Sequence, residues 1–389
     1  MVKGPKGREN WVFEIILVFA FIWWAPSIAF PKGAYKVGAL FAVTGPVSVI
    51  GESQRKTTEM IEGWVNAAGG IDGHPLDITV YDTKADKEVA ASGLGKLVEK
   101  EGVVAVIGTS QYDIGLSLVS LIGEHKVPFI SCTAALALPS WVKGKAWVFG
   151  VKEFRPAVEV ICEHAQKRGI VKIGILTTTS EFGRRGRTDL IKLAPKHGID
   201  IVGDEKYKPG EKNTRVYVNR VKGTDAQAMI NWSEGDSQVE ICRNWKDLRM
   251  GIPLYQGPEF GNKTMVDLAK GKAEGVLCAL QRLILMEQLP IEDPQMPALI
   301  AYKYSFKKKF GMEACPSGGY AWDALWMIIE ALRIVGPDKK RIRDYLEEHI
   351  RNWPGVTGIF TMSKKDHCGL TKEAFRMGVV KKGKWALAD

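Results

Sequence analysis

Short, continuously apolar runs alternate with helix-like stretches along most of this chain of 389 residues. Tyr35–Ala42 and Val103–Gly108 are runs of this kind, and the amphipathic stretch Glu52–Ala68 lies between them. A strand that is apolar along its whole length is typically buried on both faces, as in a parallel sheet covered by helices on each side. The pattern therefore predicts an α/β fold with a doubly wound parallel sheet.

The same pattern begins again after Val151, with a predicted helix over Pro156–Arg168 and a predicted strand over Val171–Thr177. A chain of 389 residues is long enough for two domains that each bury a core. We therefore expect two similar lobes, each built on a doubly wound parallel sheet.

The last part of the chain has a different pattern. Helices are expected there over Pro297–Phe310, Tyr320–Val335 and Lys339–Ile350. Apolar runs over Phe375–Val380 and Lys384–Leu387 then predict two strands, with Gly383 in the turn between them. The chain is therefore expected to end in a hairpin.

The N-terminus has the pattern of a secretory signal peptide. Its basic head consists of Lys3, Lys6 and Arg8. The apolar run Ile15–Ala25 follows, and Ser27–Ala29 matches a small-residue cleavage site, so residues 1–29 are predicted to be removed. The alternative is an uncleaved anchor, but this run is short for a membrane span of ~20 residues. No cysteine near the cleavage site could carry a lipid, so a lipid-anchored form is not expected. The predicted signal peptide therefore indicates an exported, periplasmic protein.

Neither the cysteines nor the histidines have the spacing of a metal site. The six cysteines are far apart and include no C-x-x-C pair: Cys132, Cys162, Cys242, Cys278, Cys315 and Cys368. Zinc sites need ligands at short spacings, and the six histidines are equally dispersed. The thiols are therefore expected to be buried or, in some cases, paired, and the sequence predicts no metal and no cofactor.

A formal net charge of +10 raises the possibility of a nucleic-acid partner. The basic residues, however, form only short runs such as Lys307–Lys309 and Lys339–Arg341. The sequence contains no arginine-rich helix and no motif that combines aromatic and basic residues for RNA. The charge is therefore interpreted as a solvated basic surface, and no nucleic-acid binding is expected.

The loops that follow the predicted strands are the candidate ligand contacts, because open parallel sheets bind ligands beyond the carboxyl ends of their strands. These loops are Thr44–Pro46, Gly108–Tyr112, Ser131–Ala135, Thr177–Gly183, Asn231–Glu234 and Gly257–Phe260. The first three belong to the first lobe and offer hydroxyls and helix-start amides, which suit a carboxylate. The others offer Glu234 and Glu259, which suit an ammonium group. The two lobes are thus predicted to recognise opposite ends of a zwitterion.

Enzyme signatures are absent from the sequence. Gly93–Lys96 reads GLGK but lacks the upstream glycine and the following serine or threonine of a phosphate-binding loop. The sequence has no G-x-S-x-G motif, and no histidine stands beside a candidate nucleophile in the strand-end loops. We therefore expect a binding protein and not an enzyme.

Motifs that carry a family resemblance are spread over nearly the whole predicted mature chain. They read TGPVSVIG over 44–51, VNAAGGIDGHPL over 65–76, LVEKEGVVAVIGT over 97–109, VPFISCTA over 127–134, GPEFGN over 257–262 and VTGIF over 356–360. With these motifs the chain resembles the leucine/isoleucine/valine-binding family of type I periplasmic binding proteins. The first two motifs are the most specific part of the resemblance.

The resemblance implies a Venus-flytrap fold, in which two lobes are joined by three hinge crossings. The crossings are expected near Gly150, Leu280 and Pro354, which assigns residues 30–150 and 281–353 to lobe 1 and residues 151–280 and 354–389 to lobe 2. It also implies that a small-molecule ligand is captured in the cleft between the lobes and delivered to the permease subunits of an ABC importer. We expect the protein to be a monomer.

Some of the family's ligand contacts are matched in this sequence. Glu259 matches the acidic residue that binds the α-ammonium group in the family, and Phe182 matches an aromatic residue that covers the ligand. Thr133 and Ala134 match loop positions that meet the ligand carboxylate mainly through the backbone.

Other family contacts are replaced. Tyr112 stands where the family has a serine, and Ala135 stands where it has a threonine. Ser110 and Thr133 are predicted to supply the missing hydroxyls. Glu234 follows the predicted strand that ends in the residues INW, and it stands where the family has an aromatic residue. Leucine is therefore not implied as the ligand.

Two classes of ligand remain open. The additional carboxylates favour an amino acid or an amino-acid-like amine, whereas Tyr112, Phe182 and Trp232 would favour a ring or an apolar tail. The second class is a small carboxylate, such as an aromatic acid. A ligand-sensing module that reports to a separate signalling partner is an alternative to import, and an enzyme is the third possibility.

Overall fold

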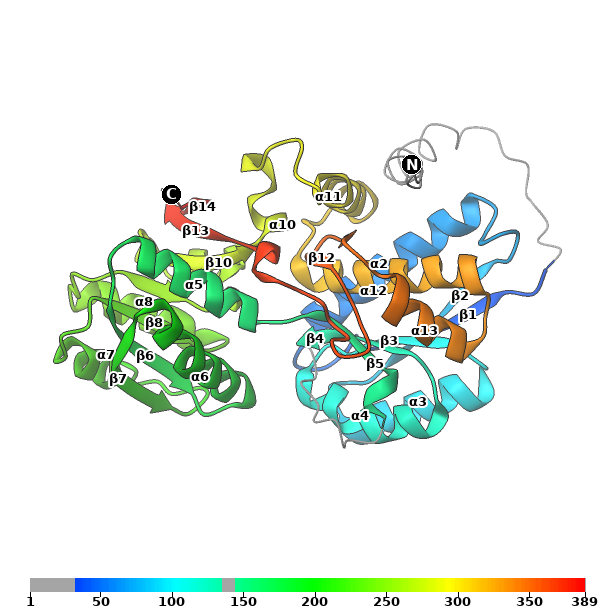
Figure 1. Cartoon of the computed structure of the whole chain (residues 1–389), viewed down its shortest axis with the longest axis horizontal. Helices are drawn as coiled ribbons and strands as arrows, with labels where there is room; N and C mark the ends of the chain where they lie inside the picture. The colour runs from blue at the N-terminus through cyan, green and yellow to red at the C-terminus, as the bar shows by residue number, and fades with distance from the viewer. Residues whose placement is uncertain (1–31, 135–143, 389) are drawn as a thin grey trace, which may run out of the picture. The chain divides into compact units, whose positions relative to one another are not determined.

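The computed structural model describes residues 32–134 and 144–388, which group into two compact units (Figure 1). The described residues of unit 1 are 32–134, 144–152, 297–355 and 361–368, and those of unit 2 are 153–296, 356–360 and 369–388. The predicted signal peptide and Ala135 lie outside the described residues. Among the described residues, no helix is both long enough and apolar enough to cross a membrane.

Unit 1 contains a five-stranded sheet in which every neighbouring pair is parallel, in the order β2-β1-β3-β4-β5. The strands are β1 (Tyr35–Phe41), β2 (Leu76–Asp82), β3 (Ala105–Gly108), β4 (Phe129–Ala134) and β5 (Val148–Lys152). The edge strand β5 was not predicted, because its short apolar run comes immediately before the chain passes into unit 2. The other four strands were predicted.

Helices cover both faces of this sheet (Figure 1). They are α2 (Ser48–Ala67), α3 (Lys87–Gly95), α4 (Tyr112–His125) and α12 (Pro316–Val335). Two further helices, α11 (Met296–Phe310) and α13 (Lys339–His349), pack on these helices. On one face α12 packs against α2, where the rings of Trp64 and Trp322 meet edge to face with 5.6 Å between centroids. On the other face α3 and α4 enclose a core that includes Leu40, Val106 and Phe129.

Unit 2 contains a seven-stranded mixed sheet in the order β14-β13-β10-β9-β8-β6-β7. The strands are β6 (Lys172–Thr178), β7 (Asp200–Tyr207), β8 (Ala228–Trp232), β9 (Leu254–Gln256), β10 (Leu277–Gln281), β13 (Phe375–Lys381) and β14 (Lys384–Leu387). The run from β7 to β10 is parallel, as predicted, and β13 and β14 add an antiparallel edge. The short strands β11 (Trp353–Pro354) and β12 (Ile359–Phe360) belong to the last crossing segment.

The predicted terminal hairpin is confirmed. Val380 pairs with Trp385, and the two residues in the turn, Lys382 and Gly383, have φ angles of 51° and 71°. Two left-handed residues in succession are what a tight hairpin turn of type I′ requires, and glycine adopts this conformation without strain.

The helices of unit 2 are α5 (Arg155–Lys167), α6 (Glu181–Leu193), α7 (Arg215–Lys222), α8 (Asp236–Asp247), α9 (Lys263–Leu268) and α10 (Arg282–Leu285). Helix α6 begins at Glu181, where the Ser180 hydroxyl caps it by accepting from Gly183 N at 3.1 Å. Successive residues of β6 contribute to hydrophobic cores on opposite faces of the sheet: Ile175 packs in the core on one face, and Leu176 packs in the core on the other. This alternation is expected of strands buried on both faces.

The observed division differs from the predicted lobes in two longer segments and in residues 151–152 and 354–355, which group with unit 1. Residues 281–296 group with unit 2, where Gln288 Nε2 donates to Trp385 O at 3.0 Å and Gln288 Oε1 accepts from Leu387 N at 2.9 Å. Residues 361–368 group with unit 1, where Gly150 N donates to the carbonyl oxygen of His367 at 3.1 Å. Each segment thus groups with the unit to which it is hydrogen-bonded, and the residue patterns alone do not reveal these bonds.

All six cysteines are free thiols in the structure. Five of them are buried, and Cys315 is half-buried. Burial raises the pKa of Cys162 and of Cys242 to about 12, which keeps these thiols protonated and unreactive at neutral pH. Within the described ranges, no three potential metal ligands are clustered.

Candidate functional site

The strand-end loops of unit 1 are tied together by Ser110. Its Oγ accepts from Ala42 N at 3.0 Å and donates to Gln54 Oε1 at 2.6 Å, and only 8% of the residue is exposed. A hydroxyl has one proton to donate, and here that proton is committed to Gln54. In this arrangement Ser110 links the loop after β3 to the residue that follows β1 and to α2, and its role as a ligand contact stays a prediction.

Three other hydroxyls gather at the start of α4. A Cβ placed on Gly115, in the first turn of this helix, would lie 3.1 Å from Thr109 Oγ1, 3.6 Å from Thr133 Oγ1 and 3.9 Å from Ser131 Oγ. Ser131 Oγ and Thr133 Oγ1 are 2.9 Å apart and share a hydrogen bond. Hydroxyls beside the first amides of a helix suit an anion such as a carboxylate. Thr133 was predicted as a contact, and Thr109 and Ser131 lie in the predicted loops Gly108–Tyr112 and Ser131–Ala135 without having been singled out.

Tyr112 and Ala134 occupy the ends of the elements that frame this group. Tyr112 is the first residue of α4 and is half-buried, and Ala134 is the last residue of β4. Because β3 and β4 are parallel neighbours, their carboxyl ends lie at the same edge of the sheet. The predicted positions in these two loops are therefore brought together.

The Asp82 carboxylate fixes the loop after β1. It accepts from Val43 N at 2.9 Å, from Thr44 N at 3.2 Å and from Lys84 N at 3.0 Å, and the Thr44 hydroxyl donates to it at 2.5 Å. Burial alone would raise the pKa of Asp82, but these hydrogen bonds lower it below its usual value. This acidic group at the unit 1 sheet edge is thus used to hold its own backbone.

An aromatic cluster lies at the corresponding strand ends of unit 2. Trp232 ends β8 and stacks on Phe182, with 5.7 Å between the ring centroids and 19° between the planes. Phe154 meets Phe182 edge to face at 5.1 Å. Trp232 is only 1% exposed, whereas Phe154 and Phe182 are half-buried. Trp232 therefore supports the cluster from the core, and Phe154, which was not predicted, joins Phe182 at its surface.

Helix α6 approaches this cluster closely because it contains two glycines. A Cβ on Gly186 would lie 2.1 Å from the indole ring of Trp232, and a Cβ on Gly183 would lie 2.0 Å from Thr178 O. Both distances are far below van der Waals contact, so any larger side chain would push the helix away. The position of the Phe182 ring on α6 depends on this close approach.

Glu234 lies between the ends of two helices. Its Oε2 accepts from Thr178 Oγ1 at 3.0 Å, and Thr178 Oγ1 is 2.9 Å from the Ser180 hydroxyl. Because Thr178 has given its single proton to Glu234, Ser180 must be the donor in the second bond. A carboxylate accepts about four hydrogen bonds, so Glu234 keeps most of its capacity for a ligand. The nearby start of α8 at Asp236 also favours a negative charge here.

Glu259 lies in a single 3₁₀ turn, Pro258–Gly261, directly after β9. The side chain is half-buried, and the buried Phe260 ring anchors the turn. Burial, together with the nearby negative charge of Glu259, raises the pKa of Cys278 well above its usual value. The capping of α9, a possible structural role for Glu259, is performed by Asn262, whose Oδ1 accepts from Thr264 N at 3.0 Å.

A further ion pair beside Phe154 was not predicted from the sequence. Glu153 Oε1 accepts from Phe154 N at 2.8 Å and lies 3.6 Å from a guanidinium nitrogen of Arg185. Burial raises the pKa of Glu153, and the charge of Arg185 offsets only part of that effect. The pair holds the start of α5 against α6 and so supports the Phe154 and Phe182 rings.

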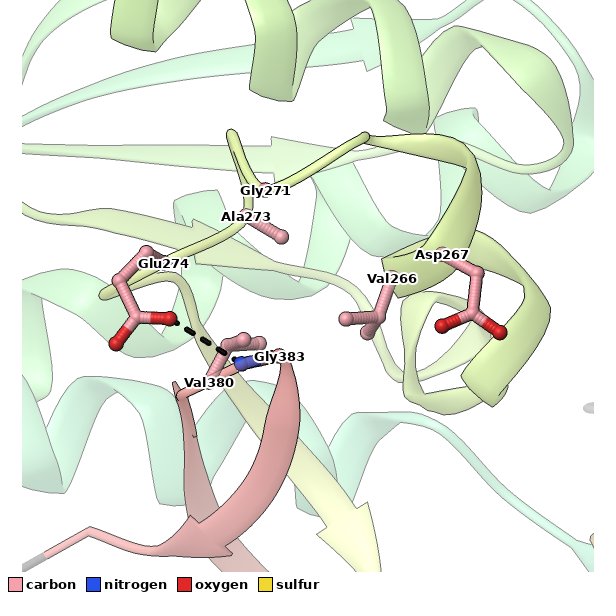
Figure 2. Close-up of a pocket in the computed structure, with 7 residues that line it drawn as sticks. All are labelled: Val266, Asp267, Gly271, Ala273, Glu274, Val380 and Gly383. Carbon is pink, nitrogen blue, oxygen red and sulfur yellow. Dashed lines mark hydrogen bonds between the residues drawn. The ribbon is translucent and has the colours of Figure 1, made fainter.

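A small pocket of about 210 Å³ lies elsewhere in unit 2 (Figure 2). It precedes β10, at the end of the sheet opposite to the loops that carry Glu234 and Glu259. Glu274 accepts there from Lys382 N at 2.9 Å and from Gly383 N at 3.3 Å. The pocket is lined by Val266, Asp267, Gly271, Ala273, Glu274, Val380 and Gly383. It therefore belongs to the terminal hairpin and not to the candidate ligand site.

Solved structures of similar fold cover nearly the whole chain. An extracellular ligand-binding receptor from Rhodopseudomonas palustris superposes with a TM-score of 0.80 at 21% identity, over 92% of this chain and 100% of that one. A branched-chain amino acid transporter substrate-binding protein from Streptococcus pneumoniae, in complex with isoleucine, gives a TM-score of 0.76 at 21% identity, over 92% and 99% of the two chains. These structures confirm the predicted fold class.

Relatives of known function are similar over a comparable length. The leucine-, isoleucine-, valine-, threonine- and alanine-binding protein of Pseudomonas aeruginosa is 24% identical over 362 residues, which is 91% of either chain. The Leu/Ile/Val-binding protein of Escherichia coli K12 is 24% identical over 294 residues, or 74% of this chain and 75% of that one. A family model for periplasmic binding proteins matches residues 34–384. The resemblance seen in the sequence is therefore confirmed, and the chain belongs to the periplasmic binding protein family.

Proposed function

We propose that this protein is exported and captures a small amino acid or amino-acid-like solute for delivery to the permease of an ABC importer. The observation that carries the proposal is the opposite polarity of the two sheet edges. Unit 1 presents hydroxyls and helix-start amides, and unit 2 presents Glu234 and Glu259 beside two half-buried aromatic rings. A ligand with a carboxylate and an ammonium group matches both edges.

The chemistry of each edge supports this assignment. Main-chain amides at the start of α4 and the Thr133 hydroxyl are donors that suit a carboxylate. Carboxylates are acceptors that pair with an ammonium group through charge-assisted hydrogen bonds. Phe182 and Phe154 offer apolar surface for a side chain. The members of the family named above bind amino acids, as their names state, which is consistent with this reading.

A thermal-shift screen on residues 30–389 tests the proposal. The panel contains L-amino acids, each together with its deaminated carboxylic acid and its decarboxylated amine. A ligand present at ~100 times its Kd should stabilise the folded protein by about 2.7 kcal/mol. We expect at least one amino acid to raise the melting temperature while both of its truncated counterparts raise it much less. If a deaminated acid stabilises the protein as much as the amino acid does, an amino-acid ligand is excluded.

A small carboxylate without an amine is the second candidate ligand. It is favoured by the hydroxyl and amide group of unit 1 and by the Phe154 and Phe182 rings, because none of these requires an amine. The same panel separates the two classes. A ligand-sensing role with a separate signalling partner predicts the same binding but no transport, so uptake by cells with and without the gene distinguishes it from import.

Cleavage of the exported chain is part of the proposal. The apolar run Ile15–Ala25 and the small residues Ser27–Ala29 support a signal peptide. N-terminal sequencing of the exported protein should begin at Phe30. A chain that keeps Met1 and remains in the membrane fraction would instead support an uncleaved anchor.

A further inference from the structure

A continuous chain of buried hydrogen bonds lies directly beneath the Glu234 and Glu259 loops of unit 2. It begins at Tyr207, the last residue of β7, whose hydroxyl donates to Asn231 Oδ1 at 2.9 Å. Asn231 Nδ2 then donates to Ser233 Oγ at 2.9 Å and to Gln256 Oε1 at 2.7 Å. These bonds join the ends of β7, β8 and β9, and the first of them crosses β6, which lies between β7 and β8 in the sheet.

The chain of hydrogen bonds continues from the sheet to α8 and back. Gln256 Nε2 donates to Gln238 O at 2.9 Å, and Gln238 Nε2 reaches Gly257 O at 3.5 Å. A backbone bond from Gly257 N to Asn231 O, at 2.9 Å, closes the circuit. We call Tyr207, Asn231, Ser233, Gln238 and Gln256 the amide network.

Burial makes the amide network expensive to build. Asn231, Gln238 and Gln256 are each 0% exposed. A buried amide costs free energy unless its donors and acceptors are paired, and apolar residues of similar size would pack at this place without that requirement. The Asn231 and Gln256 amides are paired through both oxygen and nitrogen, whereas Gln238 is bonded through nitrogen and its Oε1 has no partner among the described residues. Paired amides hold groups in one geometry, because their hydrogen bonds are directional.

The amide network ends where the two carboxylate loops begin. Ser233 immediately precedes Glu234, and Gln256 and Gly257 immediately precede the Pro258–Gly261 turn that carries Glu259. Asn231 binds both sides of this junction, since it contacts Ser233 and Gln256. A change in any of these bonds would therefore shift one loop relative to the other.

We infer that the amide network positions Glu234 and Glu259 relative to one another and so sets the selectivity of unit 2 for a ligand cation. This inference rests on the proposed function. The network residues are positioning residues, since they are buried beneath the loops and act through the two carboxylates. The alternative is that the network stabilises the fold of unit 2 and has no effect on selectivity.

The test compares two substitutions of buried or half-buried amides in unit 2. Gln256→Met removes the centre of the network and keeps the side-chain volume. Asn244→Leu, on α8, removes a hydrogen bond of Asn244 Nδ2 to Thr214 Oγ1 at 2.8 Å that lies outside the network. Tyr207→Phe deletes a single hydroxyl and is the milder network variant, to be used if Gln256→Met does not fold.

The first readout is binding of two probe pairs that differ only in the amine: L-phenylalanine with 3-phenylpropanoate, and L-leucine with 4-methylpentanoate. For a pair whose amino acid binds the wild type, Gln256→Met should raise its Kd roughly tenfold and change that of the deaminated acid less than about twofold. Asn244→Leu should change neither Kd. Equal changes for both members of the pair would overturn the inference.

The second readout, amide hydrogen exchange, requires no ligand. Gln256→Met should accelerate amide exchange at residues 232–236 and 259–262. The acceleration should be roughly tenfold larger than that caused by Asn244→Leu, when the two variants are compared at the same decrease in melting temperature. If the wild type binds neither amino acid, the proposed function fails for these probes, and exchange still decides whether the network holds the loops. Equal exchange in the two variants would overturn the inference.

Discussion

The strand-end edges of the two units are built from the same topological positions but with opposite chemistry. In unit 1 the edge presents hydroxyls and helix-start amides, and the Asp82 carboxylate is used on its own backbone. In unit 2 the edge presents Glu234 and Glu259 above buried amides and beside aromatic rings. The strand-end edge therefore supplies hydroxyl and amide donors in one unit and carboxylate acceptors in the other.

Ser110 and Glu234 show why an internal hydrogen bond has different consequences at the two edges. Each was predicted to contact the ligand, and each is bonded within its own unit. The Ser110 hydroxyl loses its only proton to Gln54, whereas a carboxylate that accepts one hydrogen bond can accept several more. A carboxylate that accepts a hydrogen bond within the protein can therefore still accept others from a ligand, whereas a hydroxyl that has donated its proton within the protein cannot donate to a ligand.

The largest expected effect is on the aromatic side of unit 2. Gly186→Ala should destabilise the protein by about 2–3 kcal/mol, because its Cβ would overlap the Trp232 ring. Gly63→Ala is the matched control, since Gly63 is an exposed helical glycine of unit 1 with no atom closer than Lys309 Nζ at 4.0 Å. It should be neutral or stabilising by up to about 1 kcal/mol. Denaturant unfolding measures both, and equal effects would show that α6 does not depend on close approach.

The next effect separates a structural role from a ligand role at the edge of unit 1. Ser110→Ala should destabilise the protein by about 1–3 kcal/mol, because it leaves Ala42 N and Gln54 Oε1 without their partner. Affinity for the amino acid identified by the screen should change less than about threefold. Thermal unfolding and calorimetry measure the two quantities. A large loss of affinity at unchanged melting temperature would instead make Ser110 a ligand contact.

The smallest effect concerns pH. The pKa of Asp82 is lowered in the folded state, so its stabilising contribution is complete above the unfolded value of about 3.9 and is lost as the pH falls through the folded value. Asp82→Asn should therefore cost about 1 kcal/mol at pH 7 and progressively less below pH ~4. Asp77→Asn, an exposed residue on the same strand, is the control. A pH-independent difference between wild type and Asp82→Asn would contradict the assigned role of this carboxylate.

Much of the fold could be predicted because strands buried on both faces have a strong apolar pattern. The short helix α7 was not predicted, since eight residues give little periodicity. Trp232 was predicted as a ligand contact because it follows a strand, but the sequence does not reveal that Gly186 lets α6 cover it. Phe154 was missed for the converse reason, since it follows the unpredicted strand β5.

The candidate site was only partly predictable. Strand-end placement located the loops of both units, because it depends on topology. It could not show which polar groups are already satisfied, since Ser110 meets a residue of α2 and Glu234 meets a residue of β6, both distant in sequence. The amide network was missed for the same reason, because asparagine and glutamine near strand ends also occur as ordinary turn residues.

Calorimetry on Glu259→Gln tests the central claim, that unit 2 binds the cationic end of the ligand. The titrants are the amino acid found by the screen and its deaminated acid, and Glu292→Gln, an exposed glutamate of unit 2, is the control variant. We predict that Glu259→Gln weakens binding of the amino acid by about 2 kcal/mol, or roughly thirtyfold, because the ammonium loses a charged partner. Binding of the deaminated acid should be unchanged or tighter, and Glu292→Gln should behave as the wild type. If Glu259→Gln lowers the melting temperature but leaves both affinities unchanged, Glu259 has a structural role and the claim is wrong.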